Sequence, residues 1–434
     1  MYRPTGFADL AGRRVGVFGY GVEGRAAAAR LALVGADVVV VDDADLGAES
    51  LMSDHGGHEA LLACVVVLKS PGVPRRRSDV IDLEAHGVAV TSALNLWLHD
   101  VDRTRVVAVT GTKGKSTTTA LITFFLTCLD EEAQSLGNIG QPPYSPEVDS
   151  SAGWLIVEVS SFQCVDLDLA PATIVVTSLG ADHLDWHGSL AQYREDKLSL
   201  TRAPGAHRTF VADTPELRGL HGELGGDVTV VAADDDRLAA ALGLIGRHND
   251  RNVALALAVA ASLTRRSTDE IRAAARARAS RFEPLPGRLT VVATDRGVRY
   301  VDDGLATSVL PVVAALAVFD DEPLALIAGG FDRGVDYSPL VTALARRHGA
   351  TFVAALGPAG ERIAAAIATD APGVVVAPAT SMVRAVGAAA AFLTAGGVVL
   401  LSPGAPSFDA YHDWLERSAD FQRCVLDLIR RSET

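Results

Sequence analysis

The sequence predicts an α/β fold that consists of three domains, each built around a mainly parallel β-sheet. Short apolar runs rich in valine alternate along the chain with alanine-rich segments of helical length, which is typical of parallel strands joined by helices. Two of these runs end directly at glycine loops, at residues 19–24 and 111–114. At 434 residues the chain is also too long for a single hydrophobic core.

Composition excludes several classes of function. No apolar run reaches the length of a membrane span, and the first residues do not resemble a secretion signal, so we expect a cytoplasmic protein without membrane insertion. The four cysteines are widely scattered, which indicates buried thiols rather than a zinc site. The net charge of −14 argues against a nucleic-acid surface. Any anionic substrate must therefore be held by local basic groups and backbone N–H donors. We expect a monomer that acts on small molecules.

The first hundred residues have the pattern of a βαβ unit with a glycine loop. Strands are expected at residues 13–18, 37–41, 65–68 and 88–91, with a helix at 25–34. The first strand meets Gly19-Tyr20-Gly21-Val22-Glu23-Gly24, and the second ends at Asp42-Asp43. This spacing fits a dinucleotide site, a nucleotide-sugar site or close strand–helix packing, and the loop alone does not separate them. The first domain is expected to end near Asp102.

A shortened phosphate loop opens the second domain. The apolar strand 106–110 meets Gly111-Thr112-Lys113-Gly114-Lys115-Ser116-Thr117, and a helix then extends to about residue 129. Backbone N–H groups and a helix N-terminus bind phosphate in this context. Lys115 can reach the outer phosphates, and the Ser116 hydroxyl can bind Mg²⁺. We favour ATP binding over a plain glycine turn because a strand and a helix flank the loop.

Three residues that follow the loop, Glu158, His183 and His187, are candidate metal ligands. Glu158 ends the strand 154–159, and we favour a ligand over a solvated terminus because sites in such sheets gather at strand carboxyl ends. His183 and His187 follow the strand 173–177 and suggest zinc, but the nearby carboxylates suit Mg²⁺ better. Lys197 lies in a helix-like segment, where a lysine is normally solvated.

The last third of the chain repeats the alternating pattern. Asn249 suits the cap of an alanine-rich helix, and residues 280–287, with two prolines, have the composition of a linker. Further strands are expected at 289–293, 298–301, 324–328, 351–356, 373–376 and 397–401. These elements predict a parallel, doubly wound sheet.

Together these motifs resemble the Mur ligases. The matching segments occur in the order of that family: Gly111–Thr117, Gly137–Gly140, Glu158–Gln163, Asp182–Asp185, His248–Asn252, Arg288, Asp303–Thr307 and Leu401–Ser407. The resemblance covers essentially the whole chain and is greatest to the MurD group, which adds glutamate to UDP-N-acetylmuramoyl-L-alanine in peptidoglycan precursor synthesis. It implies a Rossmann-like UDP-substrate domain at 1–103, a central P-loop ATPase-type domain at 104–284 and a Rossmann-like glutamate-binding domain at 285–434.

The resemblance also implies roles for individual residues. Contacts with the UDP substrate are expected at Val22, Asp42, Ser70, Gly72 and Asn138. ATP is expected on residues 111–117, with its adenine and ribose at Asn252, Arg288 and Asp303. The implied Mg²⁺ ligands are Ser116, Glu158, His183 and Lys197, with Lys197 carbamoylated by CO₂. The implied catalytic residues are Lys115, His183 and Lys197. The implied glutamate contacts are Thr307, Arg333, Ser407 and Trp414.

The reaction of the family begins with attack of the alanyl carboxylate on the γ-phosphate of ATP, after which the glutamate amine attacks the acyl phosphate. Departures from the family pattern cluster in the expected glutamate pocket. Gly304 and Leu305 replace a serine and a lysine, and Arg333 replaces another lysine. An arginine fork does not bind carboxylates as a lysine point charge does. These departures, and the resemblance of residues 19–26 to an L-glutamate-adding subfamily, favour L-glutamate over D-glutamate.

Three rival functions remain open. Folylpolyglutamate synthetase shares the short phosphate loop and adds glutamate, but it lacks a nucleotide-binding domain like residues 1–103. A nicotinamide dehydrogenase would use the first glycine loop and leave the second idle. A non-catalytic nucleotide-binding scaffold is disfavoured because Lys115, Glu158, His183 and Lys197 are all kept.

Overall fold

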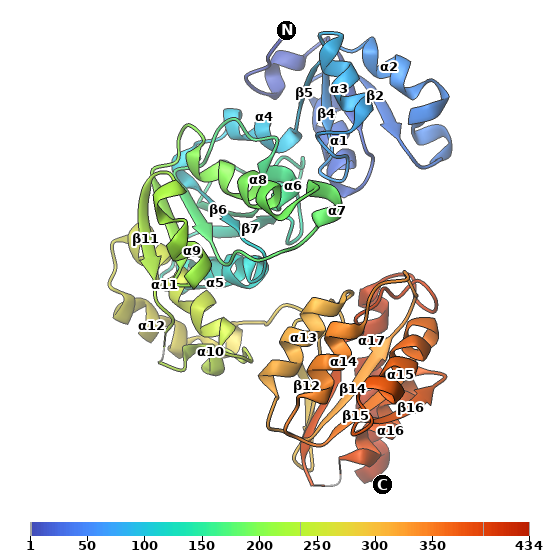
Figure 1. Cartoon of the computed structure of the whole chain (residues 1–434). Coiled ribbons are helices and arrows are strands. Elements are labelled where there is room, and N and C mark those ends of the chain that lie inside the picture. The colour runs from blue at the N-terminus through green and yellow to red at the C-terminus, as the bar shows by residue number, and fades with distance from the viewer. Residues whose placement is uncertain (1, 235, 394, 434) are drawn as a thin grey trace. The chain divides into compact units, whose positions relative to one another are not determined.

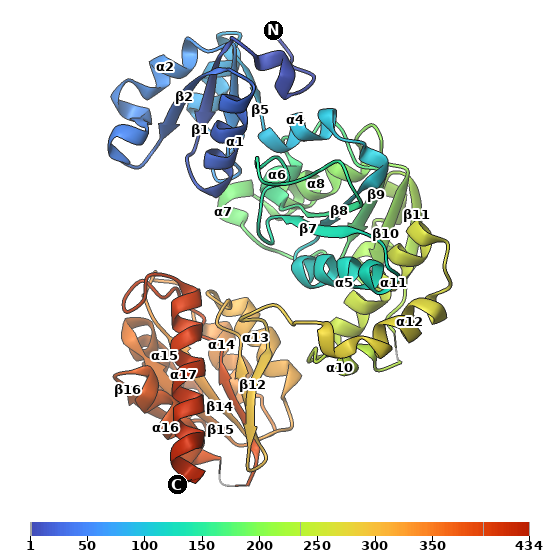
Figure 2. The ribbon, with the colours of Figure 1, turned by 180° about the vertical axis from the view of Figure 1, so that it is seen from behind.

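The chain has an α/β fold with three β-sheets (Figures 1 and 2). The structure, a computed structural model, describes residues 2–234, 236–393 and 395–433. The chain divides into two compact units, Met1–Leu238 with His248–Ala279 and Ala239–Arg247 with Ser280–Thr434. The first unit holds two of the sheets, and the boundaries at 103/104 and 284/285 stay predictions. Among the described residues, no helix has the length and apolar character needed to cross a membrane.

The first sheet is parallel throughout and has the strand order β3-β2-β1-β4-β5, which is Rossmann-like. Its strands are β1 (Arg14–Phe18), β2 (Asp37–Asp42), β3 (Leu51–Met52), β4 (Val66–Lys69) and β5 (Ala89–Thr91). The helices of this part are α1 (Val22–Leu33), α2 (His58–Leu62), α3 (Ser78–Ala85) and α4 (Ala93–Asp100). Parallel strands place the loops after β1, β2 and β4 at one edge of the sheet.

The second sheet is also parallel, in the order β11-β10-β9-β6-β8-β7. Its strands are β6 (Val106–Thr110), β7 (Ala133–Gly137), β8 (Trp154–Glu158), β9 (Thr173–Val176), β10 (Arg208–Ala212) and β11 (Asp227–Val231). Every residue of β6 is buried, because helices cover both faces of a parallel sheet. Strands β7, β10 and β11 are not among the strands expected from the sequence.

Helices α5 and α11 lie side by side on one face of this sheet, and α6 and α8 lie on the other (Figures 1 and 2). The helices that follow β6 along the chain are α5 (Lys115–Cys128), α6 (Ser161–Cys164), α7 (Leu184–His187), α8 (Leu190–Arg202), α9 (Pro215–Gly219), α10 (Leu238–Ala241), α11 (His248–Thr264) and α12 (Thr268–Ala277). The serine caps of α6 and α8, Ser160 and Ser189, each accept a backbone N–H and set where these helices begin.

The third sheet has the order β12-β13-β17-β14-β15-β16. Its strands are β12 (Thr290–Asp295), β13 (Val298–Asp302), β14 (Leu324–Gly329), β15 (Thr351–Leu356), β16 (Val375–Ala379) and β17 (Gly397–Leu401). The expectation of a wholly parallel sheet is wrong for β12, which pairs with β13 in antiparallel fashion. The reason is local: Arg296 and Gly297 both have positive φ, at 47° and 80°, which suits a tight hairpin turn.

Helices cover both faces of the third sheet. They are α13 (Val309–Val318), α14 (Ser338–Ala345), α15 (Gly357–Asp370), α16 (Met382–Phe392) and α17 (Trp414–Glu433). Buried side chains of α13, α14 and α15 form one core cluster with the sheet, and those of α16 and α17 form the other. Figure 2 shows α17 running beside α16 along one face.

Candidate active site

The carboxyl ends of three neighbouring strands define the candidate active site of the first unit. Strand β6 pairs with β8 on one side and β9 on the other, all in parallel. The phosphate loop follows β6, Glu158 ends β8, and the segment that contains His183 follows β9. Ligands of open α/β sheets bind at this kind of edge.

The phosphate loop has the tight geometry that the glycine spacing predicts. Gly114 has a φ of 90°, and a Cβ on it would lie 2.5 Å from the Asn252 side-chain oxygen, so only glycine fits. Helix α5 begins at the next residue and directs its N-terminus at the loop. Lys115 Nζ donates to the carbonyl oxygen of Gly111 at 3.0 Å, and Ser116 is buried in the first helical turn. Asn252, an expected ATP contact, therefore lies against the loop.

Glu158 has a donor set that suits Mg²⁺. Its side chain is 1% exposed, and its Oε1 accepts a hydrogen bond from Asn138 Nδ2 at 3.1 Å. Among the described residues, no hydrogen-bond donor reaches the buried Oε2. A buried carboxylate oxygen without a donor is costly unless a cation binds it. Asn138, expected to contact the UDP substrate, holds this carboxylate in place here.

Lys197 is buried rather than solvated, with 1% of its surface exposed. Its Nζ donates to the carbonyl oxygen of Gly111 at 3.0 Å and lies 5.1 Å from the centre of the Tyr193 ring. Burial, followed by the nearby charge of Lys115, lowers the pKa of Lys197 to about 7. The Lys197 amine is therefore largely uncharged at a slightly basic pH.

The two histidines after β9 have different surroundings. His183 has a φ of 49°, which is uncommon for a residue with a side chain, and its ring lies 4.8 Å from that of Phe162. Its side chain is half exposed and so is accessible to a ligand. His187 is buried, with Nδ1 at 2.7 Å from Asp196 and Nε2 at 3.0 Å from Ser161. Both ring nitrogens of His187 are occupied, so the pair does not form a zinc site.

The residues expected to contact the UDP substrate lie at the carboxyl edge of the first sheet, except Asn138. Asp42 ends β2, and its Oδ2 accepts the backbone N–H of Tyr20 at 2.6 Å. Ser70 follows β4 and donates to the Gly19 carbonyl oxygen at 2.5 Å. Val22 is 65% exposed at the start of α1, and Gly72 is exposed in the loop after β4. Hydrogen bonds between side chains and the backbone thus join the loop after β1 to the loops after β2 and β4.

The expected glutamate contacts belong to the second unit. Thr307, Arg333 and Ser407 follow β13, β14 and β17, which are parallel neighbours, so their loops share one edge of the third sheet. Arg333 is exposed and Ser407 is buried. Trp414 begins α17 and packs against Gly287, where a Cβ would lie 2.6 Å from the indole ring.

Arg288 and Asp303, the expected contacts for adenine and ribose, also lie in the second unit. Asp303 accepts a hydrogen bond from Ser402 Oγ at 2.7 Å, and burial raises the pKa of its carboxyl to about 7. Arg288 is exposed beside the linker. The contacts expected for adenine and ribose at Arg288 and Asp303 thus belong to the second unit, and their role in ATP binding stays a prediction.

Sequence reasoning missed three groups at these edges. Tyr193 donates to or accepts from Thr112 Oγ1 at 2.7 Å, which links α8 to the phosphate loop. Asp196 holds His187. In the second unit, the buried Arg417 donates to the carbonyl oxygens of Ala405 and Gly304, and burial lowers its pKa to about 10. The spacing of Tyr193 and Lys197, four residues apart on one helix, was an available signal.

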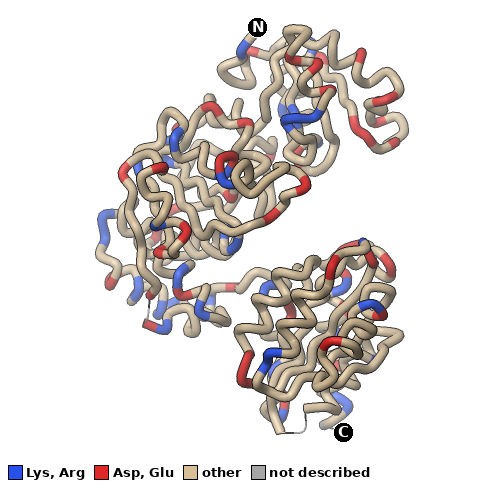
Figure 3. The backbone as a smooth tube through the Cα atoms, viewed as in Figure 1, with Lys and Arg blue, Asp and Glu red and all other residues tan. Residues whose placement is uncertain are grey.

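Acidic and basic residues are interspersed along the chain. Figure 3 shows acidic and basic positions interspersed over both units, and the sequence as a whole carries a net charge of −14. The cationic groups at the phosphate loop, Lys113 and Lys115, are therefore a local feature, and Lys113 Nζ pairs with Asp182 at 3.2 Å.

Comparison with known proteins identifies the family. Residues 109–219 match the Mur ligase middle domain. The chain is 39% identical over 97% of its length to the UDP-N-acetylmuramoyl-L-alanine–L-glutamate ligase of a Micromonospora species, covering 98% of that protein. This chain belongs to the Mur ligase family. Members of the family are ATP-dependent amide-bond ligases, and this Mur ligase is an enzyme of that class.

Two further relatives and one solved structure extend the comparison. The ligase of the same name from Salinispora tropica is 37% identical over 97% of this chain and 99% of that protein. The UDP-N-acetylmuramoylalanine–D-glutamate ligase of Leuconostoc citreum is 31% identical over 95% of this chain and 97% of that protein. The crystal structure of MurF from Acinetobacter baumannii covers 94% of this Mur ligase and 93% of its own chain, with a TM-score of 0.58 at 15% identity. At that identity the likeness concerns the fold.

Proposed function

We propose that this Mur ligase joins glutamate to UDP-N-acetylmuramoyl-L-alanine at the expense of ATP, in peptidoglycan precursor synthesis. The observation that carries the proposal is the arrangement behind the phosphate loop, where Lys197 bonds to the carbonyl oxygen of Gly111 and Glu158 offers a buried oxygen that lacks a donor. The substrates follow from the names of relatives that align over nearly the whole chain.

The chemistry needs an activated carboxylate, because oxide is too poor a leaving group for direct amide formation. In the first step an alanyl carboxylate oxygen bonds to the γ-phosphorus and ADP departs, which gives an acyl phosphate. Lys115 and the N–H groups at the start of α5 stabilise the charge on the transferring phosphoryl group. In the second step the glutamate amine attacks the acyl carbon, inorganic phosphate leaves, and the amine loses its proton.

Glu158, Ser116, His183 and Lys197 would hold Mg²⁺ in this proposal. The ion would neutralise negative charge on the phosphates. We also propose that Lys197 carries a CO₂-derived carbamate, which turns an amine into an oxygen ligand. The reaction with CO₂ requires a neutral amine, and a pKa of about 7 supplies one.

We propose L-glutamate as the preferred isomer. Two relatives that are 39% and 37% identical to this chain are named for L-glutamate, whereas the relative named for D-glutamate is 31% identical. The carboxylates of glutamate would be bound by Thr307, Arg333 and Ser407, next to Trp414. Arg333 offers a planar fork that can donate two hydrogen bonds to a carboxylate.

Phosphate release tests this function. The purified chain with Mg²⁺·ATP should release phosphate only when both UDP-N-acetylmuramoyl-L-alanine and glutamate are present, and kcat/KM should be higher for the L isomer. A preference for the D isomer would reject the stereochemical part and leave a D-glutamate ligase. Release that depends on a folate in place of the UDP substrate would instead identify a folylpolyglutamate synthetase-like enzyme.

We place the reaction in the cytoplasm, where ATP and UDP-linked precursors are found, and propose that the enzyme acts as a monomer. Light scattering of the purified chain at the concentration used for the assay checks the second point.

A further inference from the structure

The two sheets of the first unit are joined by polar contacts, which we call the seam. Lys69 Nζ and Asp166 Oδ2 are 2.7 Å apart, and their side chains are 0% and 1% exposed. Glu23 accepts hydrogen bonds from Gln163 Nε2 at 2.6 Å and from the Tyr144 hydroxyl at 2.8 Å. These contacts pair the charged groups within the protein and hold the first sheet against the second.

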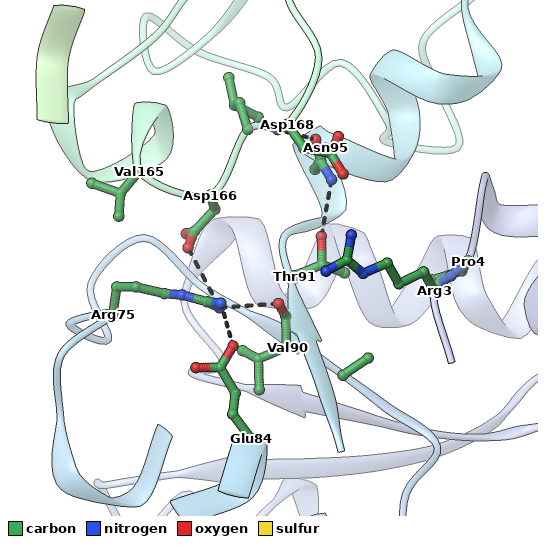
Figure 4. A pocket seen from close by; sticks show the side chains of 12 residues that line it. Arg3, Pro4, Arg75, Glu84, Val90, Thr91, Asn95, Val165, Asp166 and Asp168 are labelled. Carbon is green, nitrogen blue, oxygen red and sulfur yellow. Dashed lines mark hydrogen bonds and ion pairs between the residues drawn. The ribbon is translucent and has the colours of Figure 1, made fainter. Parts of the chain in front are cut away.

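A cavity of about 260 Å³ is lined in part by Asp166, the partner of Lys69, and by Arg75 and Glu84 (Figure 4). Arg75 extends between Asp166 and Glu84 in this view and donates to the Val90 carbonyl oxygen at 3.0 Å. Arg75 pairs with both Glu84 and Asp166 at the cavity wall, which Arg3 also lines, and this part of the seam connects the sheets.

The neighbouring Arg76 makes a contact of a different kind. Its Nη1 and Nη2 donate to Asp196 Oδ2 and Oδ1 at 3.0 and 2.9 Å, in a bidentate fork. Asp196 lies on α8, directly before Lys197, and only 5% of its side chain is exposed. Arg76 belongs to the loop after β4, so this pair connects the edge of the first sheet to the helix that carries Lys197.

Asp196 also contacts a side chain that lies beside the candidate ATP site. Its Oδ2 also lies 2.7 Å from His187 Nδ1, and His187 Nε2 lies 3.0 Å from the hydroxyl of Ser161, three residues after Glu158. The His187 ring packs edge-on against Tyr193 at 5.2 Å. Through these contacts Asp196 fixes α7 and α8 relative to the strand end that carries Glu158.

We propose that Arg76 is a positioning residue for the Mg²⁺·ATP site, acting through Asp196 and His187 on the segment that carries His183 and Lys197. The inference rests on the Mg²⁺·ATP part of the proposed function. Without the guanidinium, the hydrogen-bond partners that the nearly buried Asp196 side chain keeps among the described residues are His187 and Gln192. A buried carboxylate that is left short of donors costs free energy, and we expect α8, which carries Asp196, to shift so that the carboxylate gains contact with water. Arg76 thereby links the edge of the first sheet, where the UDP substrate is expected, to the metal ligands.

Binding of a non-hydrolysable ATP analogue at varied Mg²⁺ concentration tests this inference. Loss of a residue that orients metal ligands lowers metal affinity by about 10–100-fold. We therefore expect Arg76→Ala to raise the Mg²⁺ concentration needed for half-maximal binding by about 10-fold or more. Arg76→Lys keeps one charge without the fork and should recover part of the loss. Arg77→Ala is the matched control, because Arg77 pairs with Asp43 and Asp79 within the first-sheet region, and its Mg²⁺ requirement should equal that of the wild type.

Two results would overturn the inference. One is an Arg76→Ala protein with the Mg²⁺ requirement of the wild type. The other is an equal loss of analogue binding with and without Mg²⁺, together with a lower melting temperature, which would indicate a purely structural contact. The seam keeps Lys69–Asp166 in every variant, so the fold should survive, and Arg76→Lys provides the comparison if Arg76→Ala is unstable. Because the experiment uses neither glutamate nor the UDP substrate, failure of the proposed ligase reaction would be seen separately.

Discussion

Burial changes the acid–base chemistry of Lys197, whose side chain lies beside Lys115 with 1% of its surface exposed. An exposed lysine is protonated near neutral pH and does not react with CO₂. Here burial disfavours the ammonium ion, and Lys115 adds like charge, so the pKa falls to about 7. The fraction of neutral amine therefore increases as the pH rises through about 7.

A carbamate on Lys197 predicts two measurable effects. At a fixed concentration of dissolved CO₂, the ¹³C signal of an enzyme-bound carbamate should grow between about pH 6 and pH 8. Lys197→Ala should lack this signal, lose most of its activity, and regain part of it with short carboxylic acids that restore an oxygen ligand. Lys113→Ala is the control, since Lys113 is more than half exposed and should not respond to the acids. Full activity of Lys197→Ala without added acid would contradict the carbamate and indicate that Lys197 has a structural role alone.

At the scale of elements, the strand–loop–helix unit of β6 and α5 depends on backbone geometry more than on side chains. Gly114 has a left-handed backbone conformation and lies too close to Asn252 to accept a Cβ. Such a conformation costs of order 1–3 kcal/mol for a residue with a side chain, before the clash is counted. The shape of the phosphate loop therefore requires glycine at this point.

Gly114→Ala should weaken ATP-analogue binding by about 10-fold or more, since 1.4 kcal/mol corresponds to a factor of ten. Gly180→Ala is a matched control beside the same loop. Gly180 donates its N–H to Thr112 Oγ1, and its φ lies outside the left-handed region. An added Cβ would lie 3.7 Å from the Thr112 side chain, which is an ordinary van der Waals distance. Calorimetry of both variants checks the expectation, and equal affinities would mean that the loop adapts to a side chain.

At the scale of the whole molecule, the two compact units carry different parts of the proposed reaction. The phosphate loop and the candidate metal ligands lie in the first unit, and the expected glutamate contacts lie in the second. Substitutions at the glutamate contacts should therefore affect one substrate selectively.

Arg333→Ala should raise the KM for glutamate while the KM for ATP changes by less than about twofold. A hydrogen bond to a charged group contributes about 1.5–3 kcal/mol, which corresponds to a rise of about 10–100-fold. Arg346→Ala removes an equally exposed arginine from the end of α14 and should leave both constants unchanged. Steady-state kinetics with each substrate varied in turn distinguishes the outcomes, and a parallel rise in both KM values would contradict the division of roles.

Local patterns in the sequence were sufficient to predict much of this molecule. The expected strand at 106–110 and the helix that follows match β6 and α5 to within a residue, because apolar periodicity and turn glycines act over a few positions. The same local reasoning placed Glu158 at a strand end. Strands β10 and β11 were missed because short strands of mixed polarity toward the edge of a sheet carry a weak signal. The strand β12 was expected at 289–293, but its antiparallel direction was not, although its turn contains a glycine.

The tertiary structure alone decided which distant side chains meet. Nothing near Arg76 in the sequence indicates a partner 120 positions away, yet its fork binds Asp196, and Lys197 is buried only because α8 packs against the phosphate loop. The order of strands and helices and the motif residues could be predicted from the sequence itself, because both depend on residues that are neighbours along the chain. The contacts of Arg76, His187 and Lys197 depend on how the sheets pack, and burial then sets their chemistry by removing water.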